Sequence, residues 1–206
     1  MKLLTNTYRS VYIFLMEEAN IREVLLKKGL SLFSKKGFDS VGIQEICDSC
    51  QTSKPTLYYY FKSKVGLLDS IVDFYGSRQL ELLSKASEYH HDFIKHLTDL
   101  LKAQISFALE NPDFFYLSCN TAFSPEENPA FKSFRELQKK IDLLYLDLFE
   151  KCSNEFGNMR GLEKLYSKSF QSLIISTCNS ILQKNLELNE SNIYKVIHSF
   201  VYGVAN

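Results

Sequence analysis

Apolar residues recur at helical spacing along most of the chain, and few residues interrupt them. Only four prolines and eight glycines occur among 206 residues, so long helices are permitted. No run alternates apolar and polar residues between Gly or Asn turns, as half-buried strands do. Because 45% of the residues are hydrophobic and 23% are charged, the chain can bury a substantial core. The sequence therefore predicts an all-α fold.

A short two-faced helix is predicted within residues Cys50–Lys64. Ser53 can cap this helix with its hydroxyl, and a proline follows in the first turn, where no N–H is needed. Leu57 and Phe61 stand four residues apart and share the inner face. The remaining face carries donors of the kind that hold nucleic-acid phosphates: Tyr58, Tyr59, Tyr60, Lys62 and Lys64. From this stretch alone, a DNA-facing helix and a plain amphipathic helix both remain open.

The residues upstream complete a helix-turn-helix pattern. Residues 20–23 (Asn-Ile-Arg-Glu) have the form of a capping box and predict a helix that ends at Gly37 in a left-handed stop. A second, short helix is predicted over Gly42–Cys50, and residues 51–53 form the turn into the next helix. Two short helices joined by a tight turn after a longer helix are typical of DNA-binding heads.

Residues 21–75 also match the residue types and spacing of a known family. The matching residues are Leu32-Phe33, Lys36-Gly37-Phe38, Ile43 to Cys47, Ser53 to Phe61, Ser63-Lys64 and Leu67-Leu68. In these positions the chain resembles the TetR family of bacterial transcriptional regulators. The resemblance implies an N-terminal three-helix DNA-binding domain, which we place at residues 20–66, and a larger helical ligand-binding and dimerisation domain at residues 67–206. Residues 1–19 are expected to be a leader of uncertain structure, and Met16 is an alternative start.

The resemblance assigns roles to single residues of the short helix. Lys54, Pro55, Thr56 and Tyr58 match positions that approach base edges or nearby phosphates. Tyr59, Tyr60 and Lys64 match positions that grip the backbone, and Ser53 completes the predicted DNA-binding set as the cap. Two departures from the family pattern are Gly42, which lacks a capping hydroxyl that Ser40 could replace, and Gln51, where glycine is usual.

Further helices are predicted from apolar spacing in the C-terminal two thirds of the chain. They cover residues 67–83, 93–108, 131–152, 162–181 and 193–204, with a short helix from Pro112 and a loop over residues 122–130. In the resembled family the last two helices pair with their copies in a second subunit. Here that implies a homodimer built from residues 161–184 and 191–204.

The resemblance also implies a small-molecule site in the body. Aromatic and soft residues that could line a hydrophobic cavity are Phe93, Phe114, Phe115, Tyr116, Cys119, Phe123, Phe131 and Tyr145. The same residues at helical spacing also fit a plain core, and that alternative stays open. The histidines are scattered, so core or solvated roles are favoured over metal binding or catalysis.

Five cysteines in a helical chain suggest a reducing compartment. Cys47 and Cys50 form a Cys-x-x-Cys pair, but a zinc site needs two further ligands, and His90-His91 does not have the required spacing. We therefore expect the cysteines to pack in the core, and we predict no metal and no cofactor.

The predicted function is a dimeric DNA-binding transcriptional regulator, a repressor released from a near-palindromic operator by a hydrophobic or aromatic small molecule. The alternative is a TetR-like DNA-binding protein without an inducer, such as a chromosome-organising or division-linked factor.

No Ser/His/Asp, Cys/His or Gly-rich phosphate motif indicates an enzyme. No apolar run approaches the length of about 20 residues that spans a membrane, so we expect a cytoplasmic protein. The formal net charge is zero, which argues against indiscriminate coating of nucleic acid.

Overall fold

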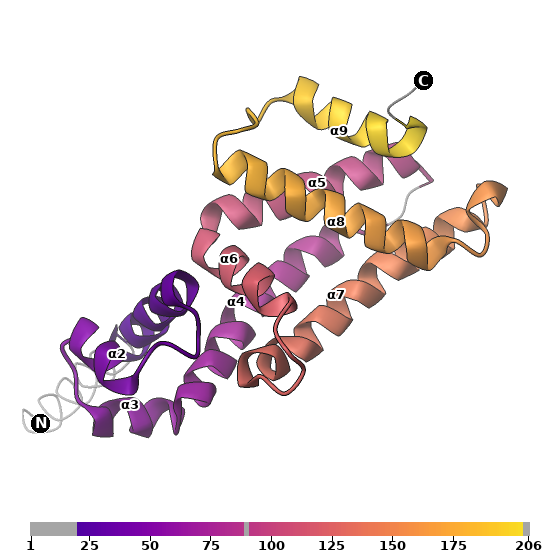
Figure 1. Ribbon diagram of the computed structural model, residues 1–206. Coiled ribbons are helices and arrows are strands. Elements are labelled where there is room, and N and C mark those ends of the chain that lie inside the picture. The colour runs from indigo at the N-terminus through magenta and orange to yellow at the C-terminus, as the bar shows by residue number, and fades with distance from the viewer. Residues whose placement is uncertain (1–19, 89–90, 204–206) are drawn as a thin grey trace, which may run out of the picture.

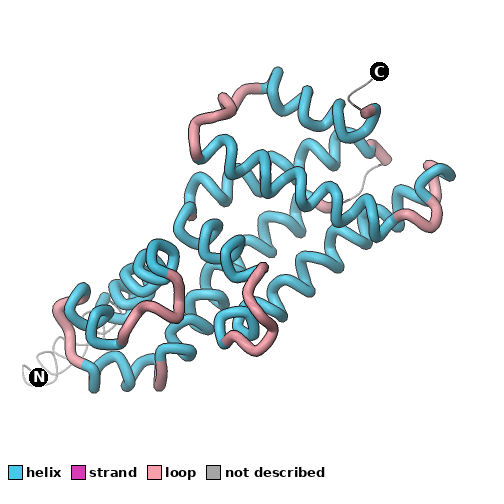
Figure 2. Tube along the Cα trace, viewed as in Figure 1, coloured by secondary structure: helices cyan, strands magenta, loops and turns pink. Residues whose placement is uncertain are grey.

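The computed structural model describes residues 20–88 and 91–203. Within these ranges every regular element is a helix, which confirms the predicted all-α fold (Figure 2). Residues 20–36 form the first described helix. The elements that follow are α2 (Ile43–Ser49), α3 (Lys54–Phe61), α4 (Lys64–Ala86), α5 (Phe93–Glu110), α6 (Pro112–Ala122), α7 (Pro129–Ser153), the 3₁₀ turn η1 (Gly157–Met159), α8 (Glu163–Leu182) and α9 (Glu190–Tyr202).

Prolines mark where three of these helices begin. Pro55, Pro112 and Pro129 lie in the first turns of α3, α6 and α7, respectively. A proline there removes only an N–H that has no partner within the helix, and its fixed φ suits the helix. The loop predicted over residues 122–130 is consequently shorter, because α6 still includes residue 122 and α7 already starts at residue 129.

Two residues in the turns of the N-terminal region are left-handed, and the one at Gly37 was predicted. Gly37 ends the first helix with a φ of +80°, and Gln51 adopts a φ of +51° in the turn between α2 and α3. Both are left-handed conformations, which cost a non-glycine residue about 1 kcal/mol or more. The capping box at Asn20 is not found, since Asn20 is itself helical and a capping residue is not.

The molecule has a small head and a larger body (Figure 1). The head consists of the first described helix, α2 and α3, and α4 runs from it into the body, where it packs on α5 and α7. α8 lies across α5 and α7, and α9 packs on α5. The predicted domain boundary after residue 66 falls inside α4, so the two parts share this helix, and we keep the division as a proposal. The predicted leader, residues 1–19, lies outside the described residues.

Direct polar contacts join the head and the start of α4 to the start of α7. Asn128 Nδ2 donates to Asp39 Oδ2 at 2.8 Å, and Ser133 Oγ donates to Asp69 Oδ1 at 2.6 Å. Farther along α4, Gly76 lies so close to Leu137 of α7 that an added Cβ would come within 2.7 Å of Leu137 Cδ2. The position of α4 is therefore set by α7 as well as by the head.

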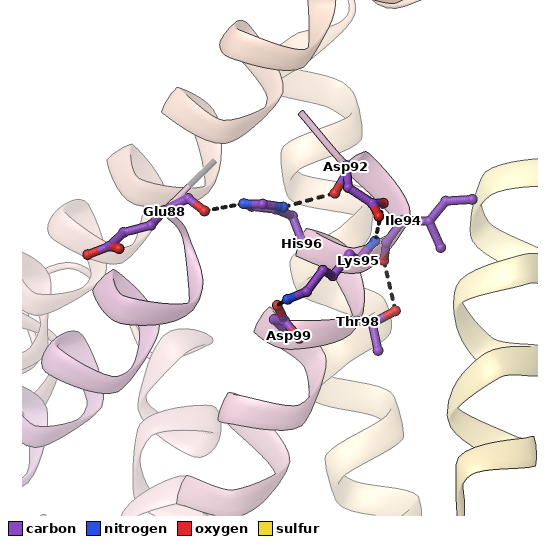
Figure 3. A network of polar contacts seen from close by, with 7 residues as sticks. All are labelled: Glu88, Asp92, Ile94, Lys95, His96, Thr98 and Asp99. Carbon is purple, nitrogen blue, oxygen red and sulfur yellow. Dashed lines mark hydrogen bonds and ion pairs between the residues drawn. The ribbon is translucent and has the colours of Figure 1, made fainter. Parts of the chain in front are cut away.

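A buried histidine links the residues after α4 to the start of α5 (Figure 3). His96 is 1% exposed, and its ring lies between the backbone oxygens of Glu88 and Asp92, with 2.9 Å between Nδ1 and Asp92 O. Asp92 also caps α5 by accepting from Lys95 N at 2.9 Å. His96 is thus a core residue that holds the end of α4 against the start of α5.

No helix in the described part of the chain combines the length and the apolar character that crossing a membrane requires.

Candidate nucleic-acid interface and body cavity

The short helix α3 presents two faces of opposite character. Ser53 Oγ accepts from Thr56 N at 3.3 Å and so caps the helix as predicted. Leu57 and Phe61 are 0% and 3% exposed, because they pack on the head core. Arg22 of the first described helix places its guanidinium 5.6 Å from the centre of the Phe61 ring. With its inner face fixed in this way, α3 holds the outer face in one orientation.

The predicted base-facing residues lie on the accessible part of α3. Lys54 and Pro55 are exposed, and Tyr58 is 45% exposed. Thr56 is half-buried, and its hydroxyl lies 2.8 Å from Ser53 Oγ, so it also takes part in the cap. These residues therefore lie in the N-terminal part of the helix, where Lys54, Pro55 and Tyr58 are open to a ligand.

The predicted backbone-gripping residues have different surroundings. Tyr59 is 63% exposed, whereas Tyr60 is half-buried and lies edge-on to the Tyr59 ring with 5.0 Å between centroids. Lys62 is exposed and ends α3 with a φ of +65°. Of the predicted tyrosines, Tyr58 and Tyr59 are the ones most open to a ligand.

Lys64 has an internal role that its sequence position did not indicate. Its Nζ donates to the backbone oxygens of Phe38 at 2.9 Å and Val41 at 3.0 Å, and it lies 4.3 Å from the centre of the Phe38 ring. An ammonium has three N–H donors, so one remains for a phosphate. Lys64 thus holds the turn between the first described helix and α2, and its grip on DNA stays a prediction.

We expect Lys64→Met to destabilise the head. The substitution leaves the Val41 carbonyl oxygen without the Lys64 donor and leaves the Phe38 carbonyl oxygen with Val41 N, at 3.4 Å, as its donor. The lost hydrogen bonds lower the free energy of unfolding by about 1–3 kcal/mol. Chemical denaturation measures this, and Lys62→Met, at an exposed site, is the matched control. A loss of about one unit of salt slope, with unchanged stability, would instead make Lys64 a phosphate contact.

The second helix of the motif begins without a side-chain cap. Gly42 is the N-cap residue of α2 and offers no side-chain hydrogen bond to it. Whether Ser40 replaces the missing hydroxyl as a phosphate donor stays a prediction. An ion pair of 2.5 Å between Lys36 Nζ and Glu45 Oε1 joins the first described helix to α2.

The two cysteines of the Cys-x-x-Cys pair are buried. Cys47 and Cys50 are 0% and 9% exposed, which confirms that they pack in the core. Burial raises the pKa of both thiols, so the reactive thiolate is disfavoured.

The body contains a cavity of about 70 Å³ bordered by α4, α5, α6, α7 and α8. Four of the predicted pocket residues line it: Phe114, Phe115, Cys119 and Tyr145. Burial raises the pKa of the Cys119 thiol to about 11 and also raises the pKa of the Tyr145 hydroxyl. Both groups are therefore neutral at neutral pH.

The other predicted pocket residues do not join this cavity. Phe93 lines a separate cavity of about 590 Å³ near α9, and Phe131 lines one of about 220 Å³ between α6 and α7. Tyr116 is half-buried against the Phe115 ring. Phe123 is 94% exposed at the end of α6 and belongs to no core.

Sequence reasoning missed the glutamines of the cavity. Gln79, Gln104 and Gln171 line it and are 8%, 6% and 8% exposed. Each lies on the apolar side of its helix. A polar residue at such a position was the sequence signal that could have identified these glutamines. Gln79, for example, lies four residues from buried Tyr75 and four from buried Leu83.

The last two helices leave apolar side chains uncovered. We call these the α8–α9 surface: Leu162, Leu165, Ile175, Tyr194 and Tyr202, which are 40%, 59%, 47%, 63% and 49% exposed. Along α9 the rings of Tyr194, His198 and Tyr202 follow one another with 5.4 and 4.7 Å between centroids. Large apolar side chains exposed in this way are typical of interaction surfaces.

The chain is similar to bacterial regulators in sequence and in fold. The family described as "Bacterial regulatory proteins, tetR family" matches residues 25–71. The uncharacterised HTH-type transcriptional regulator YerO of Bacillus subtilis (strain 168) is 32% identical over 129 residues, which are 60% of this chain and 44% of that protein. The chain spans about half the length of the first curated relatives that it matches.

Solved structures share the whole architecture. A TetR-family transcriptional regulator from Bordetella parapertussis 12822 has a TM-score of 0.71 at 17% identity, over 90% of this chain and 96% of that one. AibR, solved in complex with isovaleryl coenzyme A and operator DNA, has a TM-score of 0.68 at 16% identity, over 89% and 98% of the two chains. These likenesses establish the fold, and the match over residues 25–71 coincides with the helix-turn-helix head. The chain therefore belongs to the TetR family of bacterial regulatory proteins.

Proposed function

We propose that the protein is a dimeric transcriptional repressor that binds a near-palindromic operator and is released from it by a small molecule. The observation that carries this proposal is that the outer face of α3 is exposed and rich in hydrogen-bond donors. Lys54, Tyr58 and Tyr59 are exposed on a helix whose inner face is anchored in the head core. A rigid helix that carries donors on its free face has the form of a recognition helix for the major groove.

The chemistry of the α3 face suits DNA at two levels. Lys54, at the first turn, can donate to the guanine acceptors in the major groove, and Pro55 and Thr56 can contact a thymine methyl. The hydroxyls of Tyr58 and Tyr59 can donate to phosphates, which sets the register of the head on the duplex. The head thus offers base-reading groups beside backbone-holding groups.

The α8–α9 surface supports dimerisation. One head reads few bases, whereas two heads related by a two-fold axis can read half-sites about 34 Å apart. Covering Leu165 and Tyr194, which are 59% and 63% exposed, would stabilise the dimer through the hydrophobic effect. We propose that this surface joins two copies of the chain.

The body cavity supports release by a small molecule. It touches α4, the helix that starts directly after α3, and α6, which leads into the loop that contacts the head through Asn128 and Asp39. A ligand that favours one position of α4 shifts the population of head arrangements, provided that it binds the two arrangements with different affinity. AibR, which shares the fold, was solved with both an acyl-CoA and operator DNA.

Protection mapping on the DNA upstream of the protein's own gene tests the proposal. We expect one near-palindromic protected site and an affinity that falls steeply with salt. Equal affinity for random DNA would contradict sequence-specific regulation. Many scattered genomic sites, with no release by any hydrophobic compound, would favour a chromosome-organising role.

At the protected site we expect Lys54→Ala to weaken binding roughly 5- to 150-fold, which corresponds to the ~1–3 kcal/mol of one base contact. The loss should be greatest for the native sequence and smaller for sequences altered at the contacted base. Titration of labelled operator variants measures it. Lys85→Ala, at the far end of α4, is the matched control and should bind like the unchanged protein.

A further inference from the structure

Three glutamines from three different helices surround the small body cavity. Gln79 comes from α4, Gln104 from α5 and Gln171 from α8, and each is more than nine-tenths buried. Gln79 and Gln104 share a hydrogen bond, and Gln171 Nε2 donates to Ser167 Oγ at 3.4 Å. Each buried amide atom left without a partner costs about 1–3 kcal/mol, so aliphatic residues would pack these positions at lower cost. Stability alone therefore does not explain a glutamine at each of them.

The amide of Gln79 is only half satisfied. Its Nε2 donates to Gln104 Oε1 at 3.1 Å, while its Oε1 is fully buried and has no hydrogen-bond partner among the described residues. Native proteins pair most buried polar atoms, so an unpaired one requires an explanation. This oxygen belongs to a residue that lines the cavity, and it is the fully buried side-chain acceptor left unpaired among the described residues.

The rest of the lining is neutral. Among the described residues no Asp, Glu, Lys or Arg side chain lines the cavity, and its walls are formed mainly by aromatic and aliphatic groups such as Phe114 and Ile174. A charged ligand would lose its hydration there without meeting a counter-charge. An uncharged ligand with one polar group avoids that cost.

The cavity has room for a small ligand body. Its volume of about 70 Å³ corresponds to roughly five to seven water-sized groups. Gln138 lines the same cavity and is exposed, so the lining reaches the surface and larger ligands can extend outward there.

We propose that the cavity binds an uncharged, largely apolar ligand whose hydroxyl or N–H group donates a hydrogen bond to Gln79 Oε1. This inference rests on the proposed function, because it names the chemical class of the effector. The contact would act directly on α4, the helix that joins α3 to the body. The competing occupant is water, which would satisfy the same oxygen without selecting any ligand.

Calorimetric titration of the full chain, without DNA, separates these occupants. Phenol and toluene are probes of equal size that differ in one donor, and benzylammonium and benzoate add a positive or a negative charge. We expect phenol to bind about tenfold more tightly than toluene, which is the effect of one hydrogen bond. Neither charged probe should bind.

Two variants locate the contact. Gln79→Met keeps the length of the side chain and removes the amide, and Gln79→Leu fills the site with an aliphatic group. We expect both to lose the preference for phenol over toluene while they retain the helical circular dichroism of the unchanged protein. Gln44→Leu, the same kind of change at an exposed glutamine on α2, is the matched control and should retain the preference.

The proposal is overturned by equal binding of phenol and toluene to the unchanged protein, by a preference that persists in Gln79→Met, or by tighter binding of a charged probe. Absence of binding by all four probes also overturns it and leaves water as the occupant. Because these titrations contain no DNA, their failure is distinct from failure of the proposed function, which operator protection tests separately.

Discussion

The double variant Leu165→Glu/Tyr194→Glu is expected to be a folded monomer that binds the operator at least about 100-fold more weakly than the unchanged protein. Both side chains are more than half exposed in the single chain, so the charges do not disturb its core. In the proposed dimer the same positions are covered, and burying unpaired carboxylates costs several kcal/mol for each ion. DNA affinity falls for the following reason. In the dimer, binding of one head keeps the second head at a high effective concentration near the other half-site, and a monomer lacks this second head.

Light scattering coupled to gel filtration reports the mass of the variant, and titration of labelled operator reports its affinity. The control is Phe123→Glu/Leu143→Glu, which adds the same charge at residues that are 94% and 64% exposed outside the α8–α9 surface. The control should remain dimeric. A dimeric Leu165→Glu/Tyr194→Glu variant with native affinity would move the interface away from α8 and α9.

The second large effect is expected from Gly66→Ala, in the first turn of α4. A Cβ at this position would lie 2.0 Å from the backbone oxygen of Phe61, the last residue of α3. The obstacle is backbone, so no side-chain rotation relieves it, and α3 must shift relative to α4. We expect the free energy of unfolding to fall by about 1–3 kcal/mol, which is typical of overpacking, and operator affinity to fall with it.

Urea denaturation of the full chain measures the stability of this variant. Gly157→Ala is the control, because nothing lies within 4 Å of a Cβ built there and its φ is not left-handed. The interpretation would be wrong if the two variants were equally stable. A shift of α3 would also show as altered amide signals of residues in the head.

The sequence predicted the helices of the body well because their signals are local. The apolar spacing that begins at Phe93 corresponds to α5, and the proline at residue 112 separates α5 from α6 as expected. Helical periodicity, first-turn prolines and left-handed glycines act within a few residues, so they can be read without knowing the fold. The miss at Asn20 is of another kind, since Asn20 is itself helical although its pattern predicts a cap.

The candidate sites were predicted less evenly. The exposed residues of α3 were found because their pattern spans a single short helix. Lys64 was assigned to DNA alone, and its bonds to Phe38 and Val41 cross 26 and 23 residues of sequence. Phe123 was placed in the pocket from its hydrophobicity, but it lies beyond the last turn of α6, where spacing no longer fixes its direction.

By itself, then, the sequence determined the helices, the helix-turn-helix head and the family, because these depend on short-range spacing and residue type. Only the tertiary structure decided which side chains meet. It brought Gln79 and Gln104 together across α4 and α5, left one amide oxygen unpaired beside a cavity, and kept Tyr194 and Leu165 on the surface. The physical reason is that burial and hydrogen-bond pairing depend on how five helices pack around one volume, and no single helix carries that information.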